Sequence, residues 1–170
     1  MFPSHDLGGN VTPSPSTSGG GGGAGGYRAS GFGPSPLQAS PIFLAGGTFN
    51  ITIGAGSAQA PGHAQPGSDS IFNVCGTEGS DKFTASGGGG GGGSGSSAGK
   101  PGGSGGGSAG TPEPGSTFAG GTGNTPPVSP PQGNSGGGAP GPSTARGGSG
   151  GRGAGGAGSN ATNPGGPGGS

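Results

Sequence analysis

Residues 87–93 read GGGGGGG, and this uninterrupted run decides which folds the chain can adopt. Glycine loses more backbone entropy on ordering than any other residue. Such a run is therefore either disordered or uses its missing side chains to bring backbones into close contact. The rest of the chain is similar in character, with 55 glycines and 19 prolines among 170 residues, a composition typical of low-complexity sequences.

Downstream of this run, non-glycine residues recur at every third position over several stretches. Residues 164–170, PGGPGGS, are the clearest example. Three residues per turn is the geometry of a polyproline II helix, whose rise of about 3.1 Å per residue would make residues 87–93 roughly 22 Å long. We therefore expect polyglycine type II helices that pack through backbone hydrogen bonds. Uninterrupted glycine suits the interior of such a bundle, and G-G-x segments suit its edges.

Collagen and a disordered chain are the competing interpretations of the glycine content. The collagen triple helix needs glycine strictly at every third residue, and this phase breaks where Ser104 and Ser108 stand four apart. Disorder stays open, because fixing each residue costs about 1–2 kcal/mol and a net backbone hydrogen bond returns about 0.5–1.5 kcal/mol. Only a bundle in which most backbone groups find partners can balance that cost.

Residues 42–53, IFLAGGTFNITI, carry the strongest β signal in the chain. They predict a hairpin, because the central Gly46-Gly47 suits a two-residue primed turn with positive φ. Alternation then gives the hairpin one apolar and one polar face. The expected cross-strand pairs, which share the apolar face with Ile53, are Leu44 opposite Phe49 and Ile42 opposite Ile51.

Two shorter strands are expected at residues 71–75 and 82–85. The longest stretch without glycine or proline, residues 68–75, is too short for a stable helix. The expected fold is therefore mostly irregular, with a short antiparallel β cluster, packed polyglycine type II helices and no α-helix. The expected parts are a Ser/Thr/Pro-rich arm at 1–18 and a glycine-rich domain over 19–170, with the β cluster at about 41–85 and the polyglycine region at about 87–170.

The charged and reactive side chains argue against an enzyme. Five Lys and Arg balance five Asp and Glu, so few cations are present to bind nucleic acid. The histidines His5 and His63 stand apart from other ligand types, and Cys75 is the single cysteine. We therefore expect no catalytic site, no metal, no cofactor and no intrachain disulfide.

The sequence shows neither a charged-then-apolar leader nor a long apolar span, so we expect no signal peptide and no membrane insertion. Gly99-Lys100 is similar to the end of a phosphate-binding loop. The motif fails, because Ser94 occupies the position of its first glycine and Pro101 the position of its Ser or Thr.

The order of these features resembles the glycine-rich domain of bacteriophage tail and virion proteins. The strand that ends in Gly-Ala-Gly, between GGYR and the second glycine run, is the most specific element of the resemblance. In related phage adhesins such tracts form a sandwich of polyglycine type II helices whose tip loops bind the host surface. The matching segments are GGGGGAGGYR (19–28), GGTFNITIGAG (46–56), GSDSIF (67–72), FTASGGGGGGG (83–93) and GKPGGSGGG (99–107).

The resemblance implies a non-enzymatic structural protein of the virion, associated with the tail or fibre. Its implied partners are other virion proteins and a host surface receptor, and capsid decoration fits the same features. Two alternatives come from other classes of protein. The segments Arg146-Gly-Gly and Gly-Arg152-Gly resemble the RGG elements of RNA-binding tails. A polyglycine bundle with regular faces could bind ice.

Two segments, residues 111–118 and 124–135, interrupt the glycine pattern with Pro, Asn, Gln and one aromatic. Phe118 is the only aromatic residue after Phe83, so it either packs against a neighbour, such as a proline-rich turn, or contacts a ligand. The resemblance implies that exposed loops contact the receptor. The candidate receptor-contact residues are Phe118, Asn124, Gln132 and Asn134.

Overall fold

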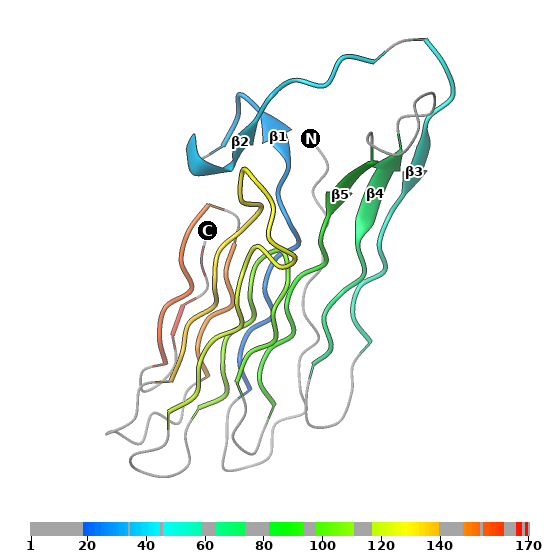
Figure 1. Ribbon diagram of the computed structural model, residues 1–170. Coiled ribbons are helices and arrows are strands. Elements are labelled where there is room, and N and C mark those ends of the chain that lie inside the picture. The colour runs from blue at the N-terminus through cyan, green and yellow to red at the C-terminus, as the bar shows by residue number, and fades with distance from the viewer. Residues whose placement is uncertain are drawn as a thin grey trace.

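Regular secondary structure is sparse in this protein (Figure 1). The computed structural model describes residues 19–33, 35–44, 46–58, 64–73, 82–93, 98–110, 117–139, 148–153, 155–161, 166–167 and 169. Their elements are β1 (Ala29–Ser30), the 3-10 helix η1 (Ser35–Leu37), β2 (Gln38–Ala39), β3 (Asn50–Thr52), β4 (Ser70–Asn73) and β5 (Lys82–Ala85). In these ranges a mostly irregular chain with small strands and no α-helix is confirmed. The arm at 1–18 lies outside them.

Strands β3, β4 and β5 form an antiparallel sheet in that order. Ile51 lies opposite Phe72, and Phe72 lies opposite Phe83, so these three side chains share one face. The ring of Phe72 also lies 5.7 Å from that of Phe49 and 6.4 Å from that of Phe83. Aromatic contacts therefore hold the middle of the sheet together.

The predicted hairpin between residues 42–44 and 48–53 is wrong. Residues 42–44 form no strand, and β3 pairs with β4 instead. The alternation along β3 is as expected, but its partner is not. Pairing with β4 sets Ile51 against the large ring of Phe72, and aromatic pairs with β-branched residues are favoured cross-strand neighbours. This long-range pairing prevails over the local turn signal.

The two shorter strands agree with the sequence. The strand predicted at 82–85 is confirmed as β5, and β4 covers the described part of the strand predicted at 71–75. Residues 74 and 75 lie outside the described ranges.

A small parallel pair, β1 with β2, was not predicted. Gly31 and Gly33 have φ angles of 69° and 80° in the turn that follows β1, a backbone region that glycine enters without steric cost. Leu37 of η1, which directly precedes β2, is buried.

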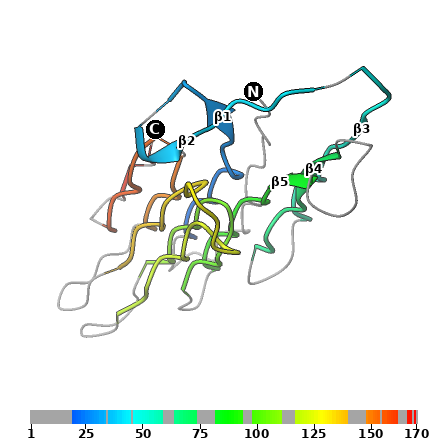
Figure 2. The ribbon, with the colours of Figure 1, turned by 45° about the horizontal axis from the view of Figure 1, so that its top comes forward.

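The glycine-rich segments run side by side as gently zigzag traces beyond the sheet (Figures 1 and 2). Residues 85–93 and 102–110 are buried throughout. Between the tract at residues 20–26 and the tract at residues 86–92, the hydrogen bonds repeat at every third residue. Gly20, Gly23 and Gly26 donate to the carbonyl oxygens of Gly92, Gly89 and Ser86 respectively.

Residues 104–108 lie at the centre of this arrangement. All five amides donate, and all five carbonyls accept, in hydrogen bonds of 2.8–3.1 Å. The partners lie in six surrounding segments and change with a period of three. Ser104 and Gly107 both form hydrogen bonds with segments 19–27 and 86–93. Gly105 and Ser108 both form them with segments 132–139 and 148–153. Gly106 forms them with Lys100 and Gly121.

Candidate functional site

The loop from Asn124 to Gln132 is braced from the inside. Asn124, which has a φ of 51°, donates through Nδ2 to the carbonyl oxygen of Val128 at 3.1 Å. Its Oδ1 accepts from the amides of Val128 and Gln132, both at 3.2 Å. The Asn124 side chain therefore shapes the loop, and its oxygen already has two internal donors.

Gln132, one of the candidate receptor-contact residues, is not a surface residue in this structure. Its side chain is only 1% exposed. Gln132 Oε1 accepts from the Ser86 amide at 2.9 Å, and Nε2 donates to Ser86 Oγ at 3.0 Å. The carboxamide is buried because it accepts a hydrogen bond from the buried amide of Ser86, and a buried amide needs such a partner.

Phe118 packs internally. It forms an isolated antiparallel bridge with Ala139, with backbone hydrogen bonds of 3.1 and 2.8 Å. Its half-buried ring packs against the buried pair Ala139 and Ala161. The packing interpretation therefore describes Phe118 better than ligand contact, although the packing partners are alanines and not a proline-rich turn.

Asn134 is half-buried, and its carbonyl oxygen accepts from the Gly105 amide at 2.9 Å. It lies close to Gly123, at the same end as the Asn124 loop. Phe118 lies at the other end of these antiparallel segments, where it pairs with Ala139. The structure thus brings Asn124, Gln132 and Asn134 to one end and leaves Phe118 apart.

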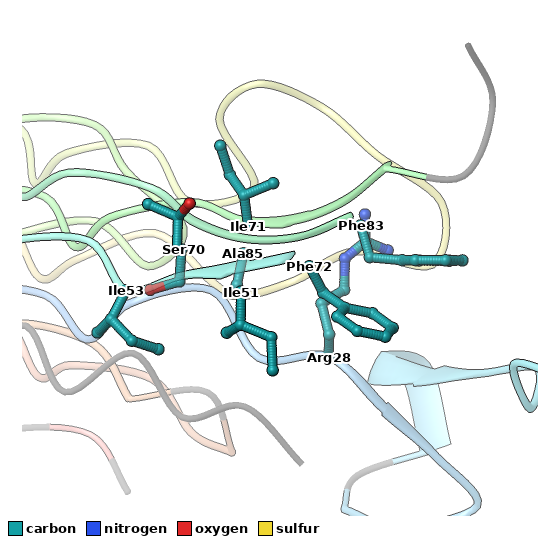
Figure 3. A pocket seen from close by; sticks show the side chains of 9 residues that line it. Arg28, Ile51, Ile53, Ser70, Ile71, Phe72, Phe83 and Ala85 are labelled. Atoms are coloured by element: carbon teal, nitrogen blue, oxygen red, sulfur yellow. The ribbon is translucent and has the colours of Figure 1, made fainter. Parts of the chain in front are cut away.

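The apolar side of the β3-β4-β5 sheet is exposed, which the sequence did not predict. Ile51, Ile53 and Phe83 are 53%, 71% and 36% exposed. Figure 3 shows these side chains around a shallow pocket, with Arg28 at one side. Arg28 Nε donates to the Thr84 carbonyl oxygen at 3.4 Å. The alternation predicted this apolar face but not that it lies open.

The pocket is small, with a volume of about 30 Å³. Among the described residues no group of three His, Cys, Asp or Glu side chains could hold a metal. His63 and Cys75 lie outside the described ranges. No helix in the described part has the length and apolarity to span a bilayer.

Arg152 is built into the packed segments. Its amide donates to the Gly105 carbonyl oxygen at 3.1 Å, and its Nε is buried with no hydrogen-bond partner. Desolvation by burial lowers the pKa of its guanidinium. Arg152 therefore differs from the freely accessible arginine of an RGG-type tail.

Comparison with known proteins finds no family model, no curated protein and no solved structure that matches this chain. Its function is therefore inferred from its own residues.

Proposed function

We propose that this chain is a non-enzymatic structural protein of a bacteriophage virion, associated with the tail or fibre. Its glycine tracts act as a rigid framework of polyglycine type II helices. Loops at the ends of the framework and the open sheet face are available to neighbouring virion proteins and to a host surface. Capsid decoration is the alternative location for the same framework.

The observation that carries this proposal is the hydrogen bonding of residues 104–108. A three-residue repeat of partners around one segment is what a helix with three residues per turn and six neighbours requires. Every amide and carbonyl in this segment is paired, which is the condition for offsetting the entropy of ordering glycine. The pattern favours an ordered scaffold over a flexible linker.

In the packed tracts, glycines such as Gly90 and Gly106 have no space for a side chain, which supports a function based on shape. A Cβ added at Gly90 would meet the carbonyl groups of Ala64 and Gln65, and one at Gly106 would meet those of Gly89 and Gly90. Backbone atoms cannot move aside as a flexible side chain can. Close approach of backbones therefore explains why so many positions in the chain are glycine.

Host recognition is the finer part of the proposal, and it rests on the braced loop. With Gln132 buried and Asn124 turned to the loop interior, the exposed residues of this loop are Pro126, Pro127 and Ser129. Internal hydrogen bonds fix their positions before binding, which reduces the entropy lost on contact with a partner. We propose these three residues as the contact surface in place of Gln132.

Purified phage particles provide the test. An antibody raised against the recombinant chain is applied to particles of the phage that encodes it, and bound antibody is located by electron microscopy. We expect labelling of the particle at the tail or fibre, whereas labelling spread over the capsid would favour decoration. Particles that contain no such chain by mass spectrometry would contradict the proposal.

A binding measurement distinguishes the virion proposal from the RNA-binding alternative. The chain is mixed with single-stranded RNA at increasing salt, and the bound fraction is measured on filters. We expect no binding, because few cationic side chains are present to release counterions. Tight binding that falls steeply with salt would support the RGG-type alternative instead.

A further inference from the structure

Strand β3 is an open edge of its sheet. The order β3-β4-β5 places β4 on one side of β3, and no described strand lies on the other. Residues 50–52 are all exposed. An unpaired strand edge presents free backbone donors and acceptors to any second strand. At the opposite edge, Arg28 Nε donates to the carbonyl oxygen of Thr84 in β5 at 3.4 Å.

The same chain contains an exposed apolar segment that lacks a strand partner. Residues 41–44, PIFL, are named the strap here, and they form no secondary structure. Ile42, Phe43 and Leu44 are 42%, 94% and 50% exposed. Figure 1 shows the chain crossing from β2 toward the upper end of β3, and not alongside that strand.

The strap and β3 have matching patterns of side chains. Their alternation fits the register that pairs Ile42 with Ile51 and Leu44 with Phe49. In that register the strap would widen the apolar sheet face by two side chains. It would also cover part of Ile51, which is 53% exposed on this face.

We propose that a second copy of this chain supplies the missing strand. The strap of one copy adds to the β3 edge of the other, and the exchange is reciprocal about a twofold axis. The strap and residues 46–58 contain no charged side chain. In a symmetric interface the same residues of both copies lie close together, so charged residues there would repel their own copies. The strap and residues 46–58 carry no charge and therefore cause no such repulsion. The proposal is independent of the virion role.

The oligomeric state of the full chain tests the exchange. Sedimentation equilibrium over a wide concentration range is expected to show a monomer–dimer equilibrium. Leu44→Asp should raise the dimer dissociation constant by about a hundredfold or more, because two unpaired carboxylates would be buried in each dimer. Phe32→Asp is the matched control. Phe32 is 71% exposed outside the strap, and this variant should dimerise like the unaltered chain.

Disulfide trapping tests the register and separates exchange from closure within one copy. In a Cys75→Ser background, Ile42→Cys and Ile51→Cys are introduced together and oxidised under dilute conditions. Exchange predicts a covalent dimer on a non-reducing gel. A disulfide confined to the monomer, a chain that is monomeric at every concentration, or a dimer that Leu44→Asp leaves unchanged would each overturn the proposal.

Discussion

The carboxamide of Gln132 forms hydrogen bonds with the amide and the hydroxyl of Ser86: Oε1 accepts from the amide at 2.9 Å, and Nε2 donates to the hydroxyl at 3.0 Å. Both residues are buried. Ser86 directly precedes the glycine run at 87–93, and Gln132 closes the loop that Asn124 braces. This contact therefore connects the loop to the framework.

Gln132→Ala should lower the free energy of unfolding by about 1–3 kcal/mol, because the buried Ser86 amide would lose its partner. Urea denaturation measures the change. Gln65→Ala is the matched control, since Gln65 is exposed, and it should stay within about 0.5 kcal/mol of the unaltered chain. Equal effects of the two substitutions would show that the buried contact contributes nothing to stability.

Gly90→Ala should destabilise the chain by at least about 3 kcal/mol, at the upper end of overpacking costs. The added methyl group would meet the backbone of Ala64 and Gln65. Gly47→Ala provides the comparison, because nothing lies within 4 Å of a Cβ added there. Alanine should be neutral or slightly stabilising at Gly47, since it reduces the entropy of the unfolded chain. Thermal melts of both variants measure the difference, and a neutral Gly90→Ala would place this run in a flexible linker.

Two buried serines should respond in opposite directions. Ser149 Oγ donates to the carbonyl oxygens of Ser108 and Gly137 at 2.9 and 2.8 Å as alternative acceptors, whereas Ser104 Oγ is buried with no partner. Ser149→Ala should cost about 1 kcal/mol, and Ser104→Ala should be neutral or stabilising, because it removes an unsatisfied hydroxyl. Chemical denaturation of both variants under the same buffer conditions checks the signs. Destabilisation by both to the same extent would contradict these hydrogen-bond assignments.

The aromatic residues of the sheet should differ in how much they contribute to the free energy of unfolding. Phe72 is 8% exposed and lies between Phe49 and Phe83, whereas Phe83 is 36% exposed. Phe72→Ala should cost about 3–5 kcal/mol, the usual range for a buried phenylalanine. Phe83→Ala should cost clearly less, because its ring already contacts water. A larger loss for Phe83 in denaturant titrations would mean that its exposed face is covered in solution.

Local patterns in the sequence predicted several parts of the fold. A strand was predicted where β5 lies, and alternation predicted the apolar side of β3. The burial of residues 87–93 agrees with an interior place for uninterrupted glycine. The pairing of β3 was not predictable in the same way. Gly46-Gly47 is a local turn signal, whereas the partner Phe72 is contributed by a distant strand. A tertiary contact thus prevailed over local chemistry.

The candidate site was less predictable, because burial depends on backbone groups that the sequence does not show. Gln132 stands among prolines, asparagine and glycine, a context typical of a surface loop. No signal in its neighbours identifies Ser86 as its partner. Ser104 and Ser108 break the triplet phase, yet both are 0% exposed. A small side chain can enter the interior wherever the facing residue is glycine, as Gly133 faces Ser104.

Amide hydrogen exchange at residues 104–108 tests the central claim, that a fully hydrogen-bonded glycine framework supports this chain. Every amide in this segment donates to a carbonyl at 2.8–3.1 Å, so NMR should show exchange far slower than at the exposed Gly46 and Gly47. Protection should be lost cooperatively in Gly90→Ala. Exchange at residues 104–108 as fast as at Gly46 and Gly47 would contradict the framework.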